Sequence, residues 1–308
     1  MSRLTTELPP LTLQNPIMSA SGTFGHGLEM AEMVPPASLG ALVSKTVTPE
    51  PRPGNPMPRV WETEAGFLNS IGLENRGLAA YLNEVLPTVA GAETLIVTNI
   101  GGHTPEEFVQ VAEALAERPE IAALEVNLSC PNVQGGKLPF ATDPETARDI
   151  LAAIGQVTDK PLWAKLSPNV ARIDEMALAV EEGGAAAITA CNTLLGMAVD
   201  WRRRRPRLAM VRGGYSGAGV RPVALRCAYD CARAVSIPVI GCGGISSAEH
   251  VLEFLVAGCT AVQVGTASFS DPALLGGLAG AVAELLEAEG VASVAELTGS
   301  LAEGTPCA

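Results

Sequence analysis

Eight short apolar segments recur along this chain of 308 residues, and they constrain its fold more than any other feature. Most are continuously apolar, as parallel strands buried on both faces are. Helical patterns separate most of them, and no linker divides the chain. Eight such steps predict an α/β protein with a single (β/α)8 TIM-barrel domain over residues 1–308; the alternative, a doubly wound open sheet, would need fewer strands. The expected strands are residues 16–20, 41–47, 94–100, 123–128, 161–167, 185–192, 238–242 and 261–265.

Local signals mark the N-terminal hairpin and several helix starts. Residues 3–14 predict a small hairpin around Pro9-Pro10. Thr104-Pro105 followed by Glu107 predicts an N-cap, a proline in the first turn and a capping box. Asp143-Pro144 and Asp271-Pro272 predict simpler starts, each an N-cap followed by a proline. Ser246 with Glu249 predicts another capping box, with the same spacing as Thr104 and Glu107.

Composition excludes several classes of protein. A net charge of −13 and 4% aromatic residues argue against nucleic-acid binding, which normally requires a basic surface. No apolar stretch is long enough to span a bilayer and no secretory signal is present, so we expect a cytoplasmic protein. The seven cysteines include no C-x-x-C pair, which indicates reduced thiols and no metal site. Cys227 and Cys231 share a helix face and are expected in the core.

Two long intervals interrupt the alternation of strands and helices. Both follow strand ends. Residues 48–93 are rich in proline and glycine, and residues 192–222 contain the arginine-rich segment 202–207 and the glycine-rich segment 213–217. Loops of this length are rare in compact domains unless they cover a site. Both are therefore expected to fold over the barrel mouth.

Cys130 is the candidate reacting group at that mouth. It lies where a strand becomes a loop, because Pro131 cannot donate to a strand ladder and restricts the residue before it. Loops at the carboxyl ends of barrel strands bind ligands. A free cysteine is also commonly a buried apolar residue, so this stretch alone leaves both interpretations open.

Two lysines interrupt apolar strands. Lys45 and Lys165 have no acidic residue in their own strands, and burying an unpaired ammonium is strongly unfavourable. Together they indicate an anionic ligand or an electron-rich cofactor. Asparagines offer donors and acceptors that suit a heterocycle, and four lie near strand ends or in the first long interval: Asn69, Asn99, Asn127 and Asn192.

Glycines after the last two strands predict a phosphate site. Gly243 and Gly244 follow the seventh strand, and Gly265-Thr266 follow the eighth. These two loops bind phosphate in many TIM barrels, where glycines let backbone N–H groups approach the anion. Neither a dinucleotide fingerprint nor a P-loop is present. A phosphate, two lysines and an electron acceptor together favour flavin mononucleotide (FMN).

The sequence resembles the class 1 dihydroorotate dehydrogenases, and their NAD-linked 1B subgroup in particular. The matching motifs follow one another in the family's order from residue 18 to residue 266. A serine in place of Cys130 would instead suggest the membrane-associated class 2 enzymes. The motifs are residues 18–25 (MSASGTFG), 44–46 (SKT), 69–73 (NSIGL), 127–132 (NLSCPN), 165–169 (KLSPN), 213–217 (GGYSG), 241–245 (GCGGI) and 264–266 (VGT).

The resemblance implies a role for each matched residue. Cys130 would be the base that removes the C5 proton of dihydroorotate while a hydride leaves C6 for flavin N5. Lys165 would face flavin N1 and O2, and residues 131–140, with a hinge at Gly135-Gly136, would form a lid. Substrate would be bound by Lys45, Asn69, Ser70, Ile71, Gly72, Leu73, Asn127, Asn132, Asn192 and Thr193. FMN would be bound by Ser21, Lys45, Thr46, Asn99, Asn127, Lys165, Cys191, Gly217, Gly243, Gly244, Gly265 and Thr266.

The resemblance also implies a partner. Electrons would pass through an iron–sulfur subunit that carries FAD and a [2Fe–2S] cluster to NAD, in a heterotetramer built on a homodimer of this chain. Residues 202–207, five arginines and a proline, are expected as a solvated loop tip or a subunit contact. Three alternatives stay open: a fumarate-linked class 1A enzyme, a dihydropyrimidine dehydrogenase-like subunit, and a non-catalytic flavin-binding protein. Two departures from the family pattern are Cys191, usually aliphatic, and Ala218-Gly219, usually Pro-Ala.

Overall fold

The computed structural model describes residues 2–129, 140–302 and 304, and eight parallel strands close into a barrel at its centre. The strands follow one another around the ring in the order β10-β15-β16-β3-β4-β7-β8-β9. Each expected segment supplies one barrel strand, so the predicted TIM barrel is confirmed. The strands are β3 (Ile17–Ser19), β4 (Ala41–Val43), β7 (Leu95–Ile100), β8 (Ile121–Asn127), β9 (Leu162–Lys165), β10 (Ala187–Ala190), β15 (Val239–Cys242) and β16 (Ala261–Val264).

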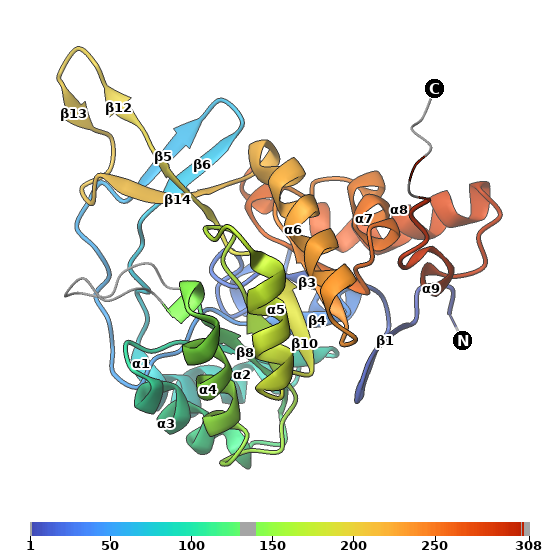
Figure 1. Cartoon of the computed structure of the whole chain (residues 1–308), viewed down its shortest axis with the longest axis horizontal. Coiled ribbons are helices and arrows are strands. Elements are labelled where there is room, and N and C mark those ends of the chain that lie inside the picture. Colours follow the sequence, from blue (N-terminus) through green and yellow to red (C-terminus); the bar gives the residue numbers. More distant parts are fainter. Residues whose placement is uncertain (1, 130–139, 303, 305–308) are drawn as a thin grey trace.

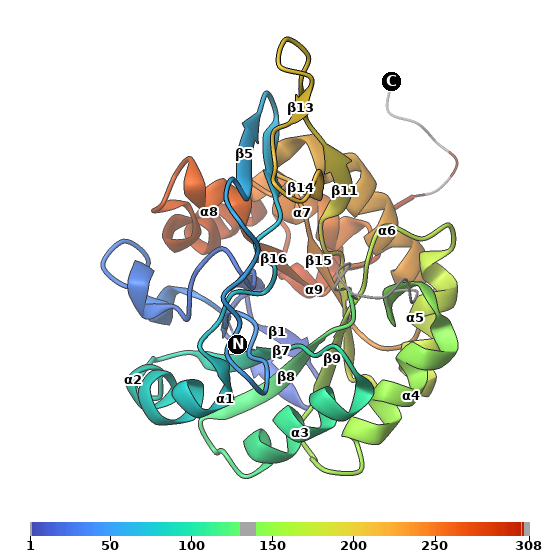
Figure 2. The same ribbon diagram turned by 90° about the vertical axis from the view of Figure 1, so that its left-hand side faces the viewer.

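Helices surround the barrel and cover the outward faces of its strands (Figure 2). Outward residues such as Val126, Ala164 and Ile188 pack against buried helix residues such as Ile150 and Met176. The helices are α1 (Gly77–Ala80), the π-helical η3 (Tyr81–Val85), α2 (Leu86–Val89), α3 (Pro105–Ala116), α4 (Pro144–Ile154), α5 (Ile173–Glu182), α6 (Arg221–Ala234), α7 (Ala248–Val256), α8 (Leu274–Ala288) and α9 (Val294–Leu297). Short 3-10 turns are η1 (Leu28–Met30), η2 (Pro36–Ser38), η4 (Phe140–Thr142), η5 (Ala218–Val220) and η6 (Thr266–Phe269).

The barrel interior is apolar at the amino-terminal ends of its strands, and the N-terminal hairpin closes this end. Strands β1 (Thr6–Leu8) and β2 (Leu11–Leu13) pair antiparallel, as predicted. Leu8 and Leu13 are buried in one cluster with inward residues of the barrel, including Trp163 and Ile240. The hairpin therefore plugs this end, and any ligand site inside the barrel has to open at the other end.

The two long intervals form an antiparallel sheet, not the loops expected from the sequence. Strands β5 (Val60–Thr63) and β6 (Gly66–Asn69) of the first interval pair with β14 (Arg212–Ser216) and β11 (Leu194–Met197) of the second, in the order β11-β14-β6-β5. The approach is close: a Cβ added at Gly213 would lie 2.5 Å from the Asn69 carbonyl oxygen. Figure 1 shows this sheet at the opposite end of the molecule from β1. The sheet therefore lies at the end where the barrel mouth is expected.

The arginine run belongs to a projecting hairpin. Strands β12 (Val199–Asp200) and β13 (Arg205–Pro206) extend beyond the sheet (Figure 1). Asp200 binds Arg207 at 3.0 Å, and the guanidinium of Arg202 stacks over Trp201. The prediction of an exposed tip is confirmed, since Arg202–Arg205 are exposed.

Two of the predicted helix starts are wrong by one or two residues. Helix α8 begins at Leu274, while the Asp271 carboxylate accepts from the Ala273 N–H at 3.2 Å. Ser247, not Ser246, caps α7 by accepting from the His250 N–H at 3.3 Å. Thr104 caps α3 as predicted. Asp143 precedes α4, but its side chain binds the Thr146 hydroxyl and no backbone N–H of the helix start.

No described helix is long and apolar enough to cross a membrane. That residues 1–308 form a single domain stays a prediction.

Candidate active site

A cavity of about 1190 Å³ opens at the carboxyl ends of the barrel strands. It is lined by strand-end residues and by the antiparallel sheet, so both long intervals do contribute to the mouth. Ligand pockets commonly measure about 300 to 1,000 Å³, and this cavity has room for a large cofactor with a small molecule beside it. An eight-stranded parallel barrel with a cavity at the carboxyl ends of its strands is the architecture of TIM-barrel enzymes.

Nearly all the residues predicted for the site lie around this one cavity. Asn99 is the exception, because it is fully buried and lies behind the wall. Cys130, Asn132 and residues 131–139 of the expected lid lie outside the described residues. Lining the cavity are Ser21, Lys45, Thr46, Asn69, Ser70, Ile71, Gly72, Leu73, Asn127, Lys165, Cys191, Asn192, Thr193, Gly217, Gly243, Gly244, Gly265 and Thr266.

A layer of polar side chains lies between the cavity and the apolar plug. The Glu125 carboxylate accepts from Asn99 Nδ2 at 2.6 Å, from Thr189 Oγ1 at 2.9 Å and from Gln263 Nε2. Gln263 belongs to β16, on the opposite side of the ring from β8, so these contacts cross the barrel interior. All four side chains are fully buried. Asn99 in turn accepts from Thr46 Oγ1 at 2.5 Å, and so supports a cavity residue from behind.

Lys165 links this layer to the cavity. Its ammonium donates to Gln263 Oε1 at 3.1 Å, to Ser21 Oγ at 3.2 Å and to Glu125 Oε1 at 3.4 Å. Burial lowers the pKa of the Lys165 ammonium. The Glu125 carboxylate, with smaller contributions from Cys242 and Cys191, raises it, and the net pKa lies above its ordinary value. The expectation that Lys165 lacks a local carboxylate is therefore wrong. The acid lies in the neighbouring strand β8, two residues away from the position paired with Lys165.

Glu125 was missed from the sequence although a signal was present. A glutamate inside an apolar strand is rare unless paired, and Glu125 shares its strand face with Asn127, two residues further on. Its side chain had to point into the barrel as that of Asn127 does.

Lys45 has a different environment. It follows β4, is half-buried and lines the cavity. Within residues 2–129, 140–302 and 304, no carboxylate forms an ion pair with Lys45. Its ammonium is therefore available to an anion in the cavity.

Amide side chains cluster beyond the carboxyl ends of β8, β9 and β10. Ser129 Oγ donates to Asn127 Oδ1 at 2.7 Å, and Asn192 Nδ2 donates to Ser129 Oγ. Asn192 Oδ1 accepts from the Thr193 N–H at 2.7 Å. Asn169, the last residue of the 165–169 motif, had no expected role; it donates to the Thr193 carbonyl oxygen at 3.0 Å and fixes this corner.

The glycines after β15 have backbone conformations that favour glycine and N–H groups without a partner in the described chain. Gly243 and Gly244 have φ of +133° and +76°, and a Cβ at Gly244 would lie 2.6 Å from Arg221 Cβ. No hydrogen bond within the described chain uses the backbone N–H groups of Gly243, Gly244 or Thr266. Free N–H groups at a strand–helix turn are a site that phosphate fits.

Two described thiols of the cavity wall, those of Cys191 and Cys242, are held in their neutral form. Burial raises the pKa of the Cys242 thiol, and a hydrogen bond with Cys227 together with burial raises that of Cys191. Both thiols are therefore neutral near pH 7. Cys227 and Cys231 are fully buried on α6, as predicted.

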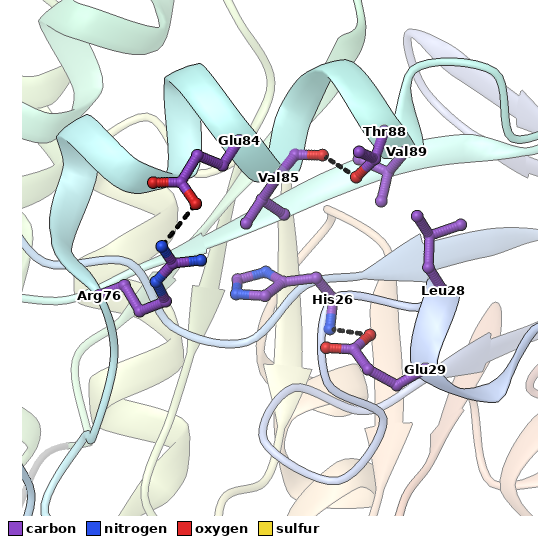
Figure 3. Close-up of a pocket in the computed structure, with 8 residues that line it drawn as sticks. All are labelled: His26, Leu28, Glu29, Arg76, Glu84, Val85, Thr88 and Val89. Atoms are coloured by element: carbon purple, nitrogen blue, oxygen red, sulfur yellow. Dashed lines mark hydrogen bonds and ion pairs between the residues drawn. The ribbon is translucent and has the colours of Figure 1, made fainter.

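A second hollow of about 210 Å³ lies between η1 and the α1–α2 helical segment (Figure 3). Figure 3 shows the His26 ring beside Arg76, which pairs with Glu84. Burial lowers the pKa of His26, and no hydrogen bond reaches its buried Nδ1. This hollow shares no residue with the large cavity. Among the described residues, no cluster of His, Cys, Asp and Glu could hold a metal ion.

Comparisons with known proteins agree with the fold. The dihydroorotate dehydrogenase family profile matches residues 3–286. Proteins of Pelobacter propionicus and Trichlorobacter lovleyi, each named dihydroorotate dehydrogenase B (NAD(+)), catalytic subunit, are 48% and 49% identical over 298 residues, which is 97% of this chain and 98% of each relative. The chain belongs to the dihydroorotate dehydrogenase family, and the resemblance read from its motifs is confirmed.

A solved structure shows the same fold. The crystal structure of DHODH from Eimeria tenella in complex with ferulenol superposes with a TM-score of 0.81 at 20% sequence identity. The match covers 97% of this chain and 88% of that one.

Proposed function

We propose that this chain oxidises dihydroorotate to orotate in pyrimidine biosynthesis, with FMN bound in the large cavity. One observation carries the proposal: a single cavity is lined by Gly243 and Gly244, by the buried Lys165 that pairs with Glu125, and by Lys45, which has no carboxylate partner in the described residues. Close relatives that span almost the same length are named dihydroorotate dehydrogenase B (NAD(+)), catalytic subunit.

The described residues fit FMN. When bound, FMN would supply the acceptor for the hydride of the substrate. The free N–H groups of Gly243, Gly244 and Thr266 would hold its phosphate, and the Ser21 and Gly217 loops would line it. The Lys165 ammonium would stabilise negative charge that builds on the isoalloxazine, a contribution that preorganised cations make in many enzymes.

The substrate would bind on the wall with Lys45 and the amides. Lys45 would pair with the carboxylate of dihydroorotate, since no acidic side chain of the described chain neutralises it. Asn69, Asn127 and Asn192 would bind the ring, and the sheet would cover it. Cys130 follows Ser129 directly and would take the C5 proton as its thiolate, a role that suits a thiol whose pKa is near the working pH.

Electrons would leave through a partner. The relatives' name "catalytic subunit" supports the existence of another subunit. We propose that it carries FAD and a [2Fe–2S] cluster and passes electrons to NAD in a cytoplasmic heterotetramer. The seven cysteines of this chain lack the spacing of an iron–sulfur motif, which is consistent with a cluster held elsewhere.

Replacement of the base tests the proposal. Cys130→Ala should keep yellow FMN and bind orotate, yet be reduced by dihydroorotate about a hundredfold more slowly in anaerobic stopped-flow experiments. Cys259→Ala, which removes a buried thiol outside the cavity, is the control. Reduction of Cys130→Ala at the unaltered rate would overturn the assignment.

Two activities compete with this one. A fumarate-linked enzyme would turn over with fumarate as sole acceptor, whereas we expect none. A dihydropyrimidine dehydrogenase-like subunit would bind uracil as well as orotate. Lys45, which has no carboxylate partner in the described residues, favours the carboxylate-bearing ligand. Equal affinities for uracil and orotate would favour the competitor.

A further inference from the structure

Glu125 has no part in the function proposed above, although it is the most strongly constrained acid of the described chain. Its carboxylate is fully buried and does not line the cavity. Four side chains converge on it: those of Asn99, Lys165, Thr189 and Gln263. A buried carboxylate is strongly unfavourable unless it is paired and hydrogen-bonded, so this arrangement requires a physical reason.

The arrangement ties Glu125 to one cavity residue. Lys165 Nζ lies 3.4 Å from Glu125 Oε1, with side chains 4% and 0% exposed. Lys165 lines the cavity and Glu125 lies directly beneath it. The other three partners of Glu125 are neutral side chains, so the carboxylate is matched to a single cation.

Few other ionisable groups act on Lys165. The thiols of Cys191 and Cys242 are the other titratable groups near it in the described chain. Both are neutral near pH 7, because burial raises the pKa of Cys242 and a hydrogen bond with Cys227 raises that of Cys191. Within the described residues, Glu125 is therefore the charge that opposes the effect of burial on Lys165.

We infer that Glu125 is a positioning residue, which holds the Lys165 ammonium in place and charged at the cavity floor and thereby sets how strongly the bound flavin favours its reduced form. The flavin part of this inference rests on the proposed function. The physical reason is direct: a cation near the flavin favours its electron-rich form, and a lysine that has lost its proton does not.

The charge state of Lys165 can be measured without a cofactor. The chain has four lysines, at positions 45, 137, 160 and 165, so selective ¹³Cε labelling gives few NMR signals. The signal that disappears in Lys165→Met identifies Lys165. In Glu125→Gln its titration midpoint should fall by at least about two pH units, because burial is no longer opposed. Glu117→Gln, which removes an exposed carboxylate after α3, should leave the midpoint unchanged.

The reduction potential of the bound flavin tests the consequence. In Glu125→Gln the flavin should become harder to reduce than in the unaltered protein as the pH rises through the new Lys165 midpoint. The double variant Glu125→Gln/Lys165→Met should not show this step, because the group that titrates is gone. Spectroelectrochemical titrations from about pH 6 to about pH 11, which span the expected new midpoint, measure both.

Each outcome decides the inference. An unmoved Lys165 midpoint in Glu125→Gln overturns it, and so does a moved midpoint with an unmoved potential profile. If Glu125→Gln does not fold, Glu125→Asp takes its place, because it keeps the negative charge but moves it away from Lys165. The Lys165 midpoint should then fall by a smaller amount, and an unchanged midpoint overturns the inference. If the unaltered protein binds no flavin, the proposed function fails. The NMR measurement needs no flavin, so it tests the Glu125–Lys165 pairing separately.

Discussion

Lys45 and Lys165 enter the same cavity from different strands, yet their surroundings have little in common. Lys165 is buried on β9, and its three N–H groups are directed to Glu125, Gln263 and Ser21. Lys45 follows β4, is half-buried and has no carboxylate partner in the described residues. One lysine is neutralised by the protein before any ligand arrives, and the other is not.

The difference indicates two uses of one residue type. A compensated cation keeps its position and charge whether or not a ligand is bound, as electrostatic preorganisation requires. An uncompensated cation gains most from an incoming anion and so contributes to affinity. We therefore expect Lys165 to matter most for stability and flavin potential, and Lys45 for substrate affinity.

The largest expected effect is on stability. Lys165→Ala leaves the Glu125 carboxylate buried without a cation and should lower the free energy of unfolding by about 3 to 5 kcal/mol. Lys45→Ala, the matched control, should change the free energy of unfolding by less than about 1 kcal/mol, because its removal leaves no buried charge without a partner. Urea unfolding of both flavin-free variants at pH 7 measures this. Equal losses of unfolding free energy in the two variants would contradict the distinction between a compensated and an uncompensated lysine.

The next effect is on substrate. Lys45→Ala should weaken dihydroorotate binding by about 1.5 to 3 kcal/mol, which is roughly 10- to 150-fold, the range for hydrogen bonds to charged groups. Lys45→Arg should restore part of it. Steady-state KM with a dye as acceptor, and Kd for orotate, report the change. An unchanged Kd for orotate would show that Lys45 does not bind the carboxylate.

A smaller effect is expected when both members of the buried pair are replaced together. Glu125→Leu/Lys165→Met removes both charges, so it should be more stable than Lys165→Ala and lie within about 2 kcal/mol of the unaltered protein. Urea unfolding of the double variant gives the value. A loss equal to the sum of the two single replacements would mean that the two charges act independently.

The smallest effect concerns pH. The pKa of Lys165 is raised in the folded protein, so its stabilisation is fully present below the unfolded value of about 10.4 and is lost as the pH rises through the folded value. The stability difference between the unaltered protein and the double variant should therefore be constant from pH 6 to 9. A slope within that window, seen in unfolding curves at several pH values, would contradict the assignment.

The barrel and most cavity residues could be predicted because their signals are local. Continuous apolar segments mark buried parallel strands, and residues at strand ends meet at one mouth whatever the helices do. Lys45, Asn127 and Gly243 were found in this way. The inward direction of Glu125 could have been predicted in the same way, but its pairing with Lys165 could not, because that contact depends on the register of two strands.

The antiparallel sheet was missed for a related reason. Asn69 and Gly214, which form a hydrogen bond across it, are 145 positions apart. Its strand β14 contains adjacent glycines, which have low strand propensity, and no hairpin turn joins it to β6. Asn99 shows the opposite error: its position at a strand end was predicted correctly, but its side chain points to Glu125 and Thr46 behind the cavity wall.

The pairing of β6 with β14 also limits how such a protein can be recombined. Two insertions from distant parts of the gene complete one sheet, with Leu68 paired to Tyr215 and Phe67 to Ser216. A chimera with a crossover between residues 70 and 211 would join halves from different parents along this seam. Exchanging residues 60–69 and 194–216 together would keep the β6–β14 pairing within one parent. The two segments should therefore be exchanged as one unit, although they are not contiguous in the sequence.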